Sequence, residues 1–177
     1  MHFLPSRGPA HLELKAREQL GHERLALQDL AALGLQAERV VEILKPPVST
    51  QLIEHLDSYS ERCYPMAVLG YTYCLERLAA FYGGKEIRAC QALCSPGVDA
   101  TRCLRVHSGL GADDEYADES VEFVATLDKS DVALIAAAAC ETGSVMVDAL
   151  LQDATTDADI ETHLRRAGIA LPFAPPS

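Results

Sequence analysis

A histidine and its neighbouring carboxylates in the first quarter of the chain have the residue types of a metal site. Lys15, Glu18, His22 and Asp29 are separated by three, four and seven residues, so they would share one stripe of a continuous helix. Glu18 lies one turn before His22, and a carboxylate and an imidazole at that spacing can ligate one metal ion. The same spacing is typical of the solvent-exposed face of an amphipathic helix. Taken alone, this segment favours an exposed face.

A second candidate is Glu76, a carboxylate within an otherwise apolar segment. Residues 68–79 are apolar on nearly every face of a helix, which predicts a buried helix. A buried carboxylate must be paired, protonated or bound to a metal, because an isolated charge is costly to remove from water. Arg77 would point about 100° away from Glu76 on a helix, so metal binding and an ion pair with another helix are equally open.

The third candidate is His107, followed seven residues later by Asp114 on the same helical stripe. Asp114 could join His107 at a metal ion, whereas Gly111 between them offers no ligand. Gly109 and Gly111 each weaken a helix by about 1 kcal/mol relative to Ala. A close approach of another helix or a local break is therefore expected here.

Four further residues are weaker candidates. Glu141 and Asp148 lie seven residues apart in an apolar segment; they could face the same cavity, although pairing between helices is the more common role. His55 and His163 lie in polar stretches and are expected at the surface. The sequence contains no Gly-rich phosphate loop, no nucleophile elbow and no zinc-type Cys/His spacing.

The elements that would position these residues are helices. Ala and Leu are abundant and only 6% of the residues are aromatic, which favours helices over strands. We expect an all-α fold, a compact bundle of about seven helices in one domain over residues 1–177, with residues 1–10 and 171–177 irregular. The predicted helices span residues 12–33, 37–44, a helix capped by Ser49 or Thr50, residues 66–81, 85–93, 100–127 and 131–151, and a last helix from Asp157 or Asp159 to Gly168.

Charge and cysteine usage restrict the class of protein. The formal net charge is −11 and there is no cluster of Lys and Arg, which argues against nucleic-acid binding and against anionic membranes. The longest apolar run, residues 132–140, is too short to cross a bilayer. The six cysteines form no Cys-x-x-Cys pair and most lie in apolar helical stretches. We therefore expect reduced, core or near-core thiols in a cytoplasmic protein without a signal peptide.

Three motifs follow one another at informative distances along the chain. They are Glu18-Gln-Leu-Gly-His22, Leu69-Gly-Tyr-Thr-Tyr-Cys-Leu-Glu76 and Leu104-Arg-Val-His-Ser108. In order and spacing they resemble the haem-oxygenase-like diiron oxidases, relatives of the TenA-type proteins, over about residues 11–150. The resemblance implies a bundle of about seven helices that binds two irons and activates O2. It also implies a small organic substrate, such as an amino acid or a fatty acid.

The resemblance further implies a set of metal ligands: Glu18, His22, Glu76 as a bridge, His107 and, less firmly, Asp114. The sequence departs from the family in two of these ligand motifs, and it is also expected to lack an N-terminal helix that is usual in the family. The family's last motif is H-x-x-x-D-x-x-H, whereas here Gly111 replaces the carboxylate and Asp114 the second histidine. Lys15 stands seven residues before His22, where some members are acidic, and a cation there would repel a metal. One or two Fe(II) ions are therefore expected, the second position being the weaker.

Three hypotheses for the function follow. The leading one is a non-haem iron oxidoreductase that uses O2 to oxidise a small substrate in the bundle core, with a homodimer left open. The first alternative is a catalytically inactive member of the same fold that binds a small ligand or a protein partner. The second alternative is a haem oxygenase, because residues 69–76 resemble its glycine-bearing helix, with His22 or His11 as the haem ligand. The interval from His22 to that helix is too short for that enzyme.

Overall fold

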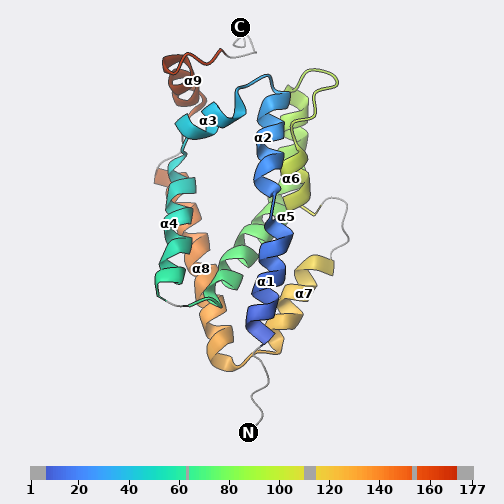
Figure 1. Cartoon of the computed structure of the whole chain (residues 1–177), viewed down its shortest axis with the longest axis vertical. Helices are drawn as coiled ribbons and strands as arrows, with labels where there is room; N and C mark the ends of the chain where they lie inside the picture. The colour runs from blue at the N-terminus through green and yellow to red at the C-terminus, as the bar shows by residue number, and fades with distance from the viewer. Residues whose placement is uncertain (1–6, 63, 110–114, 153–154, 171–177) are drawn as a thin grey trace.

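The fold is all-α, as the composition predicts. The computed structural model describes residues 7–62, 64–109, 115–152 and 155–170, and within them every regular element is a helix (Figure 1). The helices are α1 (Arg7–Gln19), α2 (His22–Ala32), α3 (Ala37–Ile43), α4 (Pro47–Glu61), α5 (Ala67–Leu93), α6 (Arg102–His107), α7 (Glu115–Ala125), α8 (Lys129–Gln152) and α9 (Asp157–Arg166).

The predicted helix over residues 12–33 is two helices. Gly21 adopts a positive φ of 93°, between α1 and α2, a conformation that suits glycine because it has no Cβ. The stripe that ran from Lys15 to Asp29 is therefore divided between two helices. The prediction that residues 1–10 are irregular is also wrong in part, because α1 already begins at Arg7.

Helix α5 continues where the sequence predicted an end. Gly83 and Gly84 lie inside one uninterrupted helix from Ala67 to Leu93, in place of two helices separated at the glycine pair. Gly83 is buried, and a Cβ there would lie 2.3 Å from the Cβ of Ser108. The glycine therefore serves the close approach of α5 to the end of α6, which the prediction had not considered.

The predicted helix over residues 100–127 is also divided. Helix α6 ends at His107, Gly109 takes a positive φ of 65°, and α7 starts at Glu115. The local break that the glycines allowed is thus the arrangement found. Asp114 lies outside the residues that the structure describes, so the prediction that it joins His107 at a metal ion stays a prediction.

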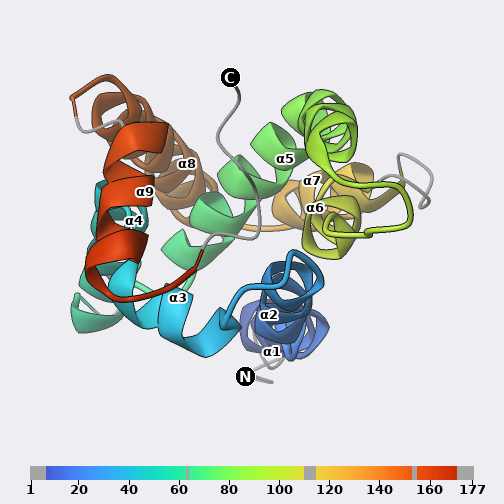
Figure 2. The same cartoon turned by 90° about the horizontal axis from the view of Figure 1, so that it is seen from above.

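Helix α5 is the centre of the arrangement. It packs along α8 on one side and against α6 on the other, while α4 lies beside α8 (Figures 1 and 2). The contact between α5 and α8 is close at Gly70, where a Cβ would lie 2.1 Å from the carbonyl oxygen of Ile135. A buried cluster of Tyr59, Ala67, Tyr71 and Ala138 joins α4, α5 and α8.

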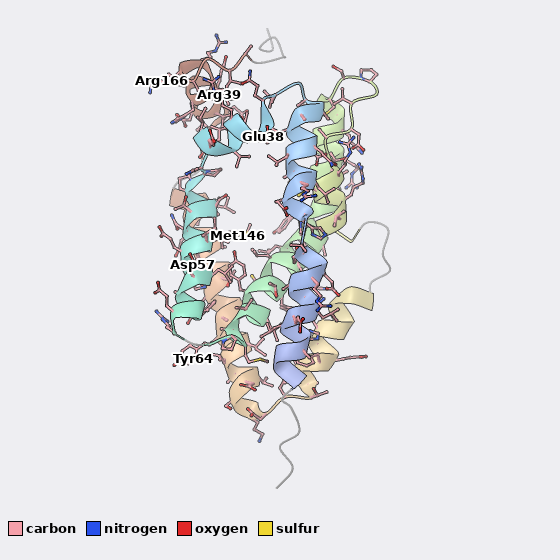
Figure 3. The ribbon with its side chains drawn as sticks, in the orientation of Figure 1. Glu38, Arg39, Asp57, Tyr64, Met146 and Arg166 are labelled. Atoms are coloured by element: carbon pink, nitrogen blue, oxygen red, sulfur yellow. The ribbon has the colours of Figure 1, made fainter. Side chains whose placement is uncertain are left out.

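A second, smaller cluster joins α3 to α9. Val40, Leu164 and Ile169 are buried together, and the guanidinium of Arg39 donates to the carbonyl oxygen of Ala167. Figure 3 shows Arg39 and Arg166 together at this end of the molecule. The end is thus held by an apolar contact and a hydrogen bond that lie away from the α5–α8 core.

Helix α8 is long and apolar enough over Lys129–Leu151 to cross a membrane, judged by length and composition alone. Such a test is also passed by core helices of soluble bundles, so it does not decide between the two. The predicted cap, Ser130, is not the one found. Asp128 caps the helix, because its Oδ1 accepts the backbone N–H groups of Ser130 at 2.9 Å and of Asp131 at 3.0 Å.

The cysteines of the described part are free thiols. Cys74, Cys90, Cys94 and Cys103 are partly buried, and burial raises the pKa of the Cys74, Cys90 and Cys103 thiols. Cys140 is exposed on α8. The prediction that all six are core or near-core residues is therefore wrong for Cys140.

Candidate functional site

Two of the predicted ligands lie in direct contact. His22 is the first residue of α2 and His107 the last residue of α6, and their ring centroids are 4.9 Å apart with the rings nearly perpendicular. Burial, and secondarily the neighbouring His22, hold the pKa of His107 below its usual value. The structure thus brings together two imidazoles that are far apart in sequence.

A carboxylate on α2 fixes the position of α6. Asp29 is buried, and its two oxygens accept the backbone N–H groups of Arg102 at 3.1 Å and of Cys103 at 2.9 Å. The Arg102 guanidinium also donates to Asp29 Oδ1 at 3.1 Å. Asp29 therefore caps the first turn of α6 from another helix, and the two histidines meet at the other end of the same helix pair.

The segment before α6 is held by a second carboxylate. Asp99 forms an ion pair of 2.7 Å with Arg105, and its Oδ1 accepts the backbone N–H of Thr101 at 3.3 Å. The hydrogen bond from Arg105 is the main reason why the pKa of Asp99 lies well below its ordinary value. The beginning of α6 is therefore anchored on both α2 and its own preceding loop.

Helix α5 presents Glu76 towards this region. Glu76 and Gly83 are seven residues apart and share one face of α5. Since Gly83 lies against Ser108, the residue after His107, the face that carries Glu76 is turned towards α6. The close approach at Gly83 is thus part of what gathers the predicted site residues.

Glu76 belongs to a charged cluster that includes Lys15. The ammonium of Lys15 is 3.0 Å from Glu18 Oε2, and Lys15 is only 7% exposed. Burial raises the pKa of Glu76, the charge of Lys15 acts in the opposite direction, and the charge of Glu18 raises it further. Lys15, Glu18 and Glu76 therefore interact with one another across α1 and α5.

The described residues do not form a metal centre. In the part of the chain that the structure covers, no three His, Cys, Asp or Glu side chains are grouped closely enough to hold a metal ion. Two imidazoles and two carboxylates are a suitable set of ligand types for Fe(II). However, the carboxylates already have a cation among them, the Lys15 ammonium. The residues present fit an ion cluster better than an iron site, and Asp114 lies outside the described part.

The weaker candidates lie elsewhere. Glu141 accepts a hydrogen bond of 3.1 Å from the Tyr59 hydroxyl, which also bonds His55 Nε2 at 2.8 Å. The expected surface position is wrong for His55, which is half-buried on α4 beside Tyr59 and Tyr71, whereas His163 is exposed. Asp148 is exposed as well. Burial and the bond to Glu141 raise the pKa of Tyr59 to about 12, so this group joins helices and remains protonated.

Two residues that organise the molecule were not found by sequence reasoning. Asp29 had been placed on an exposed stripe, and nothing near it in sequence signals that it caps a helix more than seventy residues later. Tyr59 lies in a segment where only its apolar spacing is visible, and its partners on α8 are distant in sequence. Both roles depend on long-range contacts, which local spacing does not encode.

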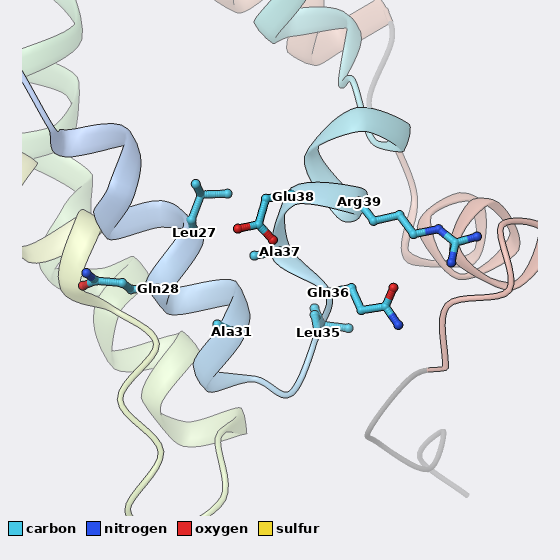
Figure 4. Close-up of a pocket in the computed structure, with 8 residues that line it drawn as sticks. All are labelled: Leu27, Gln28, Ala31, Leu35, Gln36, Ala37, Glu38 and Arg39. Atoms are coloured by element: carbon cyan, nitrogen blue, oxygen red, sulfur yellow. The ribbon is translucent and has the colours of Figure 1, made fainter.

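A shallow groove of about 530 Å³ lies between α2 and α3. Its apolar lining comes from Leu27, Ala31, Leu35 and Ala37. In Figure 4 the Glu38 carboxylate points towards Leu27, whereas the Arg39 side chain extends away from α2 towards α9. The charged group turned to the apolar part of the groove is thus a carboxylate.

Comparison with known proteins adds no relative to this geometry: no protein-family model, no curated protein and no solved structure matches the chain.

Proposed function

We propose that this chain is a metal-independent binding protein, the catalytically inactive alternative among the hypotheses from the sequence. The observation that carries the proposal is Lys15. Its buried ammonium pairs with Glu18 and acts electrostatically on Glu76, two of the residues that the family resemblance implies as iron ligands. A cation from the chain itself then balances the carboxylates, in the role that a metal ion would have.

Energetics support this reading. Two nearby carboxylates repel each other when buried, and either a proton, a metal ion or an ammonium can relieve the repulsion. The ammonium does so permanently, since Lys15 is part of the fold. A metal ion would have to displace it or bind beside it, and either would leave a buried positive charge poorly compensated. An iron-dependent reaction is therefore not assigned to these residues.

The groove between α2 and α3 is the candidate binding site. Its apolar floor suits the body of a small amphipathic molecule, and Glu38 offers a negative charge at the groove. The chain as a whole carries a formal charge of −11, which attracts cations and repels anions. We infer that the preferred ligand has a short apolar body and a cationic amine end.

Anaerobic titration with Fe(II) tests the metal-independent part of the proposal. The wild-type chain should take up no stoichiometric iron, whereas Lys15→Glu, which replaces the ammonium by a further carboxylate, should gain measurable binding. Lys85→Glu, on the exposed part of α5, is the matched control and should not gain any. Stoichiometric uptake by the wild type would overturn the proposal.

Calorimetric titration with n-hexylamine and with hexanoate tests the ligand class. Hexylamine should bind more tightly than hexanoate, and Glu38→Gln should abolish that preference. Glu42→Gln, at another exposed carboxylate of α3, should leave the preference unchanged. Equal binding of both probes, or a loss with Glu42→Gln alone, would count against the groove as a site for amines.

The second candidate function is the iron oxidase, favoured by the contact between His22 and His107. In that case the imidazole pair would hold a single Fe(II), which would supply the O2 chemistry, with Glu18, Glu76 and Asp114 as the carboxylates that the family resemblance implies. The iron titration separates the two functions. Wild-type uptake that is lost in both His22→Ala and His107→Ala would favour the oxidase.

A further inference from the structure

Helix α8 carries an unpartnered stripe on the side opposite its core face. Ile135, Ala138, Thr142 and Ala149 are buried, and this face packs against α4 and α5. Figure 2 shows α8 at the edge of the molecule with these two helices on its inner side. Although the helix is apolar enough to cross a membrane, only 22% of its most apolar stretch is buried.

The unpartnered stripe has the spacing of a helix–helix seam. It consists of six exposed residues separated alternately by four and three positions: Ala133, Ala137, Cys140, Ser144, Val147 and Leu151. This is the alternation that keeps one face of a helix turned to a partner helix over several turns. Val147 is 54% exposed and Leu151 79% exposed, so the stripe is not made of small residues alone.

The total accessible surface points to a missing partner. The chain exposes 12315 Å², whereas a folded monomer of 19.1 kDa is expected to expose about 8400 Å². As an upper bound, the residues outside the described part would account for about 3300 Å² if fully extended. After this subtraction, the accessible surface of the described residues still exceeds that expected of a folded monomer of their size by roughly 1300 Å². This excess is larger than the roughly 800 Å² of surface that one partner buries in a standard interface.

We propose that the outer stripe of α8 pairs with the same stripe of a second copy of this chain, in antiparallel orientation about a twofold axis near Cys140. The sizes of the side chains select the orientation. With the axis at Cys140, an antiparallel pair sets Val147 opposite Ala133 and Leu151 beside Lys129 and Ser130, so that bulky side chains of one copy face the small side chains of the other. A parallel pair would set Leu151 on Leu151 and Ala133 on Ala133, which would force the helices apart at one end.

The charges on α8 are compatible with this arrangement. Glu141 is exposed and flanks the twofold axis, and its carboxylate accepts a hydrogen bond from the Tyr59 hydroxyl of α4. Asp148 and Lys129 are exposed beside the two ends of the stripe. They lie on opposite flanks of the stripe, so the antiparallel pair leaves each of them at the solvent-exposed edge of the seam.

Light scattering of the full chain after size exclusion is the first test. The mass should be about twice 19.1 kDa, and Val147→Asp should reduce it to that of the monomer with an unchanged far-ultraviolet circular dichroism spectrum. Phe81→Asp, at a residue of α5 that is 79% exposed, is the matched control and should stay dimeric. A monomeric wild type, or dissociation by Phe81→Asp and not by Val147→Asp, would overturn the proposal.

Oxidative crosslinking tests the orientation of the two helices, and it does not depend on whether Val147→Asp folds. A copper–phenanthroline oxidant should link the wild type through Cys140 to the same residue of the second copy, and Cys140→Ser should remove the link. In the Cys140→Ser background, Ala133→Cys and Val147→Cys chains should crosslink when mixed. Each alone should not, because like positions would lie about 21 Å apart along the axis. Crosslinking of either chain alone would refute the antiparallel pair.

Sedimentation with phosphatidylcholine vesicles tests the other possible partner of the outer stripe of α8, a lipid surface. A dimer that seals its stripe should stay in solution when the vesicles are sedimented. If the chain is instead monomeric and sediments with the vesicles, and Val147→Asp releases it, the stripe is a lipid-binding surface and the proposal is wrong.

Discussion

The carboxylate of Asp29 on α2 accepts the backbone N–H of Cys103 at 2.9 Å and so caps α6 from a different helix. Its other oxygen accepts the backbone N–H and the guanidinium of Arg102, both at 3.1 Å. Because His22 begins α2 and His107 ends α6, this capping contact also determines how the two imidazoles meet. The contact thus stabilises α6 and also holds together the two helices that carry the histidines of the candidate site.

Replacing Asp29 should therefore have a large effect on stability. Asp29→Ala removes charge-assisted hydrogen bonds and leaves two backbone N–H groups of α6 without their acceptor, which should lower the free energy of unfolding by about 3 kcal/mol. Urea denaturation followed by circular dichroism measures it. Asp57→Ala, on the exposed part of α4, should change the free energy by less than about 0.5 kcal/mol. Equal midpoints for the two variants would contradict the capping role.

Removal of the buried ammonium should give a pH-dependent loss of stability. Lys15→Met leaves the Glu18 and Glu76 carboxylates without their shared cation and should cost about 3 kcal/mol at neutral pH. Burial already raises the pKa of Glu76, and loss of Lys15 should raise it more. As the pH falls through that raised pKa, Glu76 takes up a proton and the repulsion disappears, so the loss should be smaller at acidic pH.

Urea denaturation of Lys15→Met and of the wild type at neutral and acidic pH measures this difference. Lys85→Met, at an exposed lysine of α5, is the control and should show no such dependence. A deficit of Lys15→Met that is the same at both pH values would mean that the ammonium does not interact with the carboxylates.

Two glycines at the α5–α8 contact should respond oppositely to alanine. A Cβ at Gly70 would lie 2.1 Å from the carbonyl oxygen of Ile135 and 2.8 Å from the backbone N of Ala139, so the helices would have to separate, at a cost of about 2–3 kcal/mol. A Cβ at Gly143 would meet only Cys74 Sγ, at 3.7 Å. Gly143→Ala should therefore stabilise the chain by up to about 1 kcal/mol through helix propensity.

Thermal unfolding of Gly70→Ala and Gly143→Ala tests this pair directly, since each variant is the control for the other. A melting temperature that falls for Gly70→Ala and rises for Gly143→Ala is expected. If both variants are as stable as the wild type, α5 and α8 do not approach each other as closely as the structure indicates.

The helices could be predicted from the sequence more accurately than the points at which one helix ends and the next begins. Ala- and Leu-rich segments with helical spacing predict helices wherever they occur, and the segments of α3, α8 and α9 were found within a few residues of their ends. Glycines were the difficulty. Gly21 interrupts a continuous helical pattern and Gly83 does not, because one adopts a positive φ and the other packs against Ser108. Spacing alone cannot separate these two uses.

The motifs in the sequence named residues that the structure partly brings together, but they did not indicate the electrostatics around them. The order of the motifs was enough to group Glu18, His22, Glu76 and His107, and the structure pairs the histidines and couples the carboxylates. The part played by Lys15 could not be judged from sequence, because a lysine on an amphipathic helix is usually exposed. Its burial depends on helices that are distant in sequence.

The contact between the histidines should be visible in the titration of His107. Burial, and secondarily His22, hold the pKa of His107 below its usual value, so the folded state favours the neutral ring. The stability that this provides is present above the pKa of an unfolded histidine, about 6.5, and is lost as the pH falls through the lower pKa of the folded state. Nuclear magnetic resonance of the imidazole C–H protons should show His107 titrating below the value of an unfolded histidine. In His22→Ala the pKa of His107 should move part of the way back, because burial remains the larger cause. An unshifted pKa of His107 in the wild type would mean that its ring is not buried, and an unchanged pKa of His107 in His22→Ala would mean that the two rings do not meet in solution.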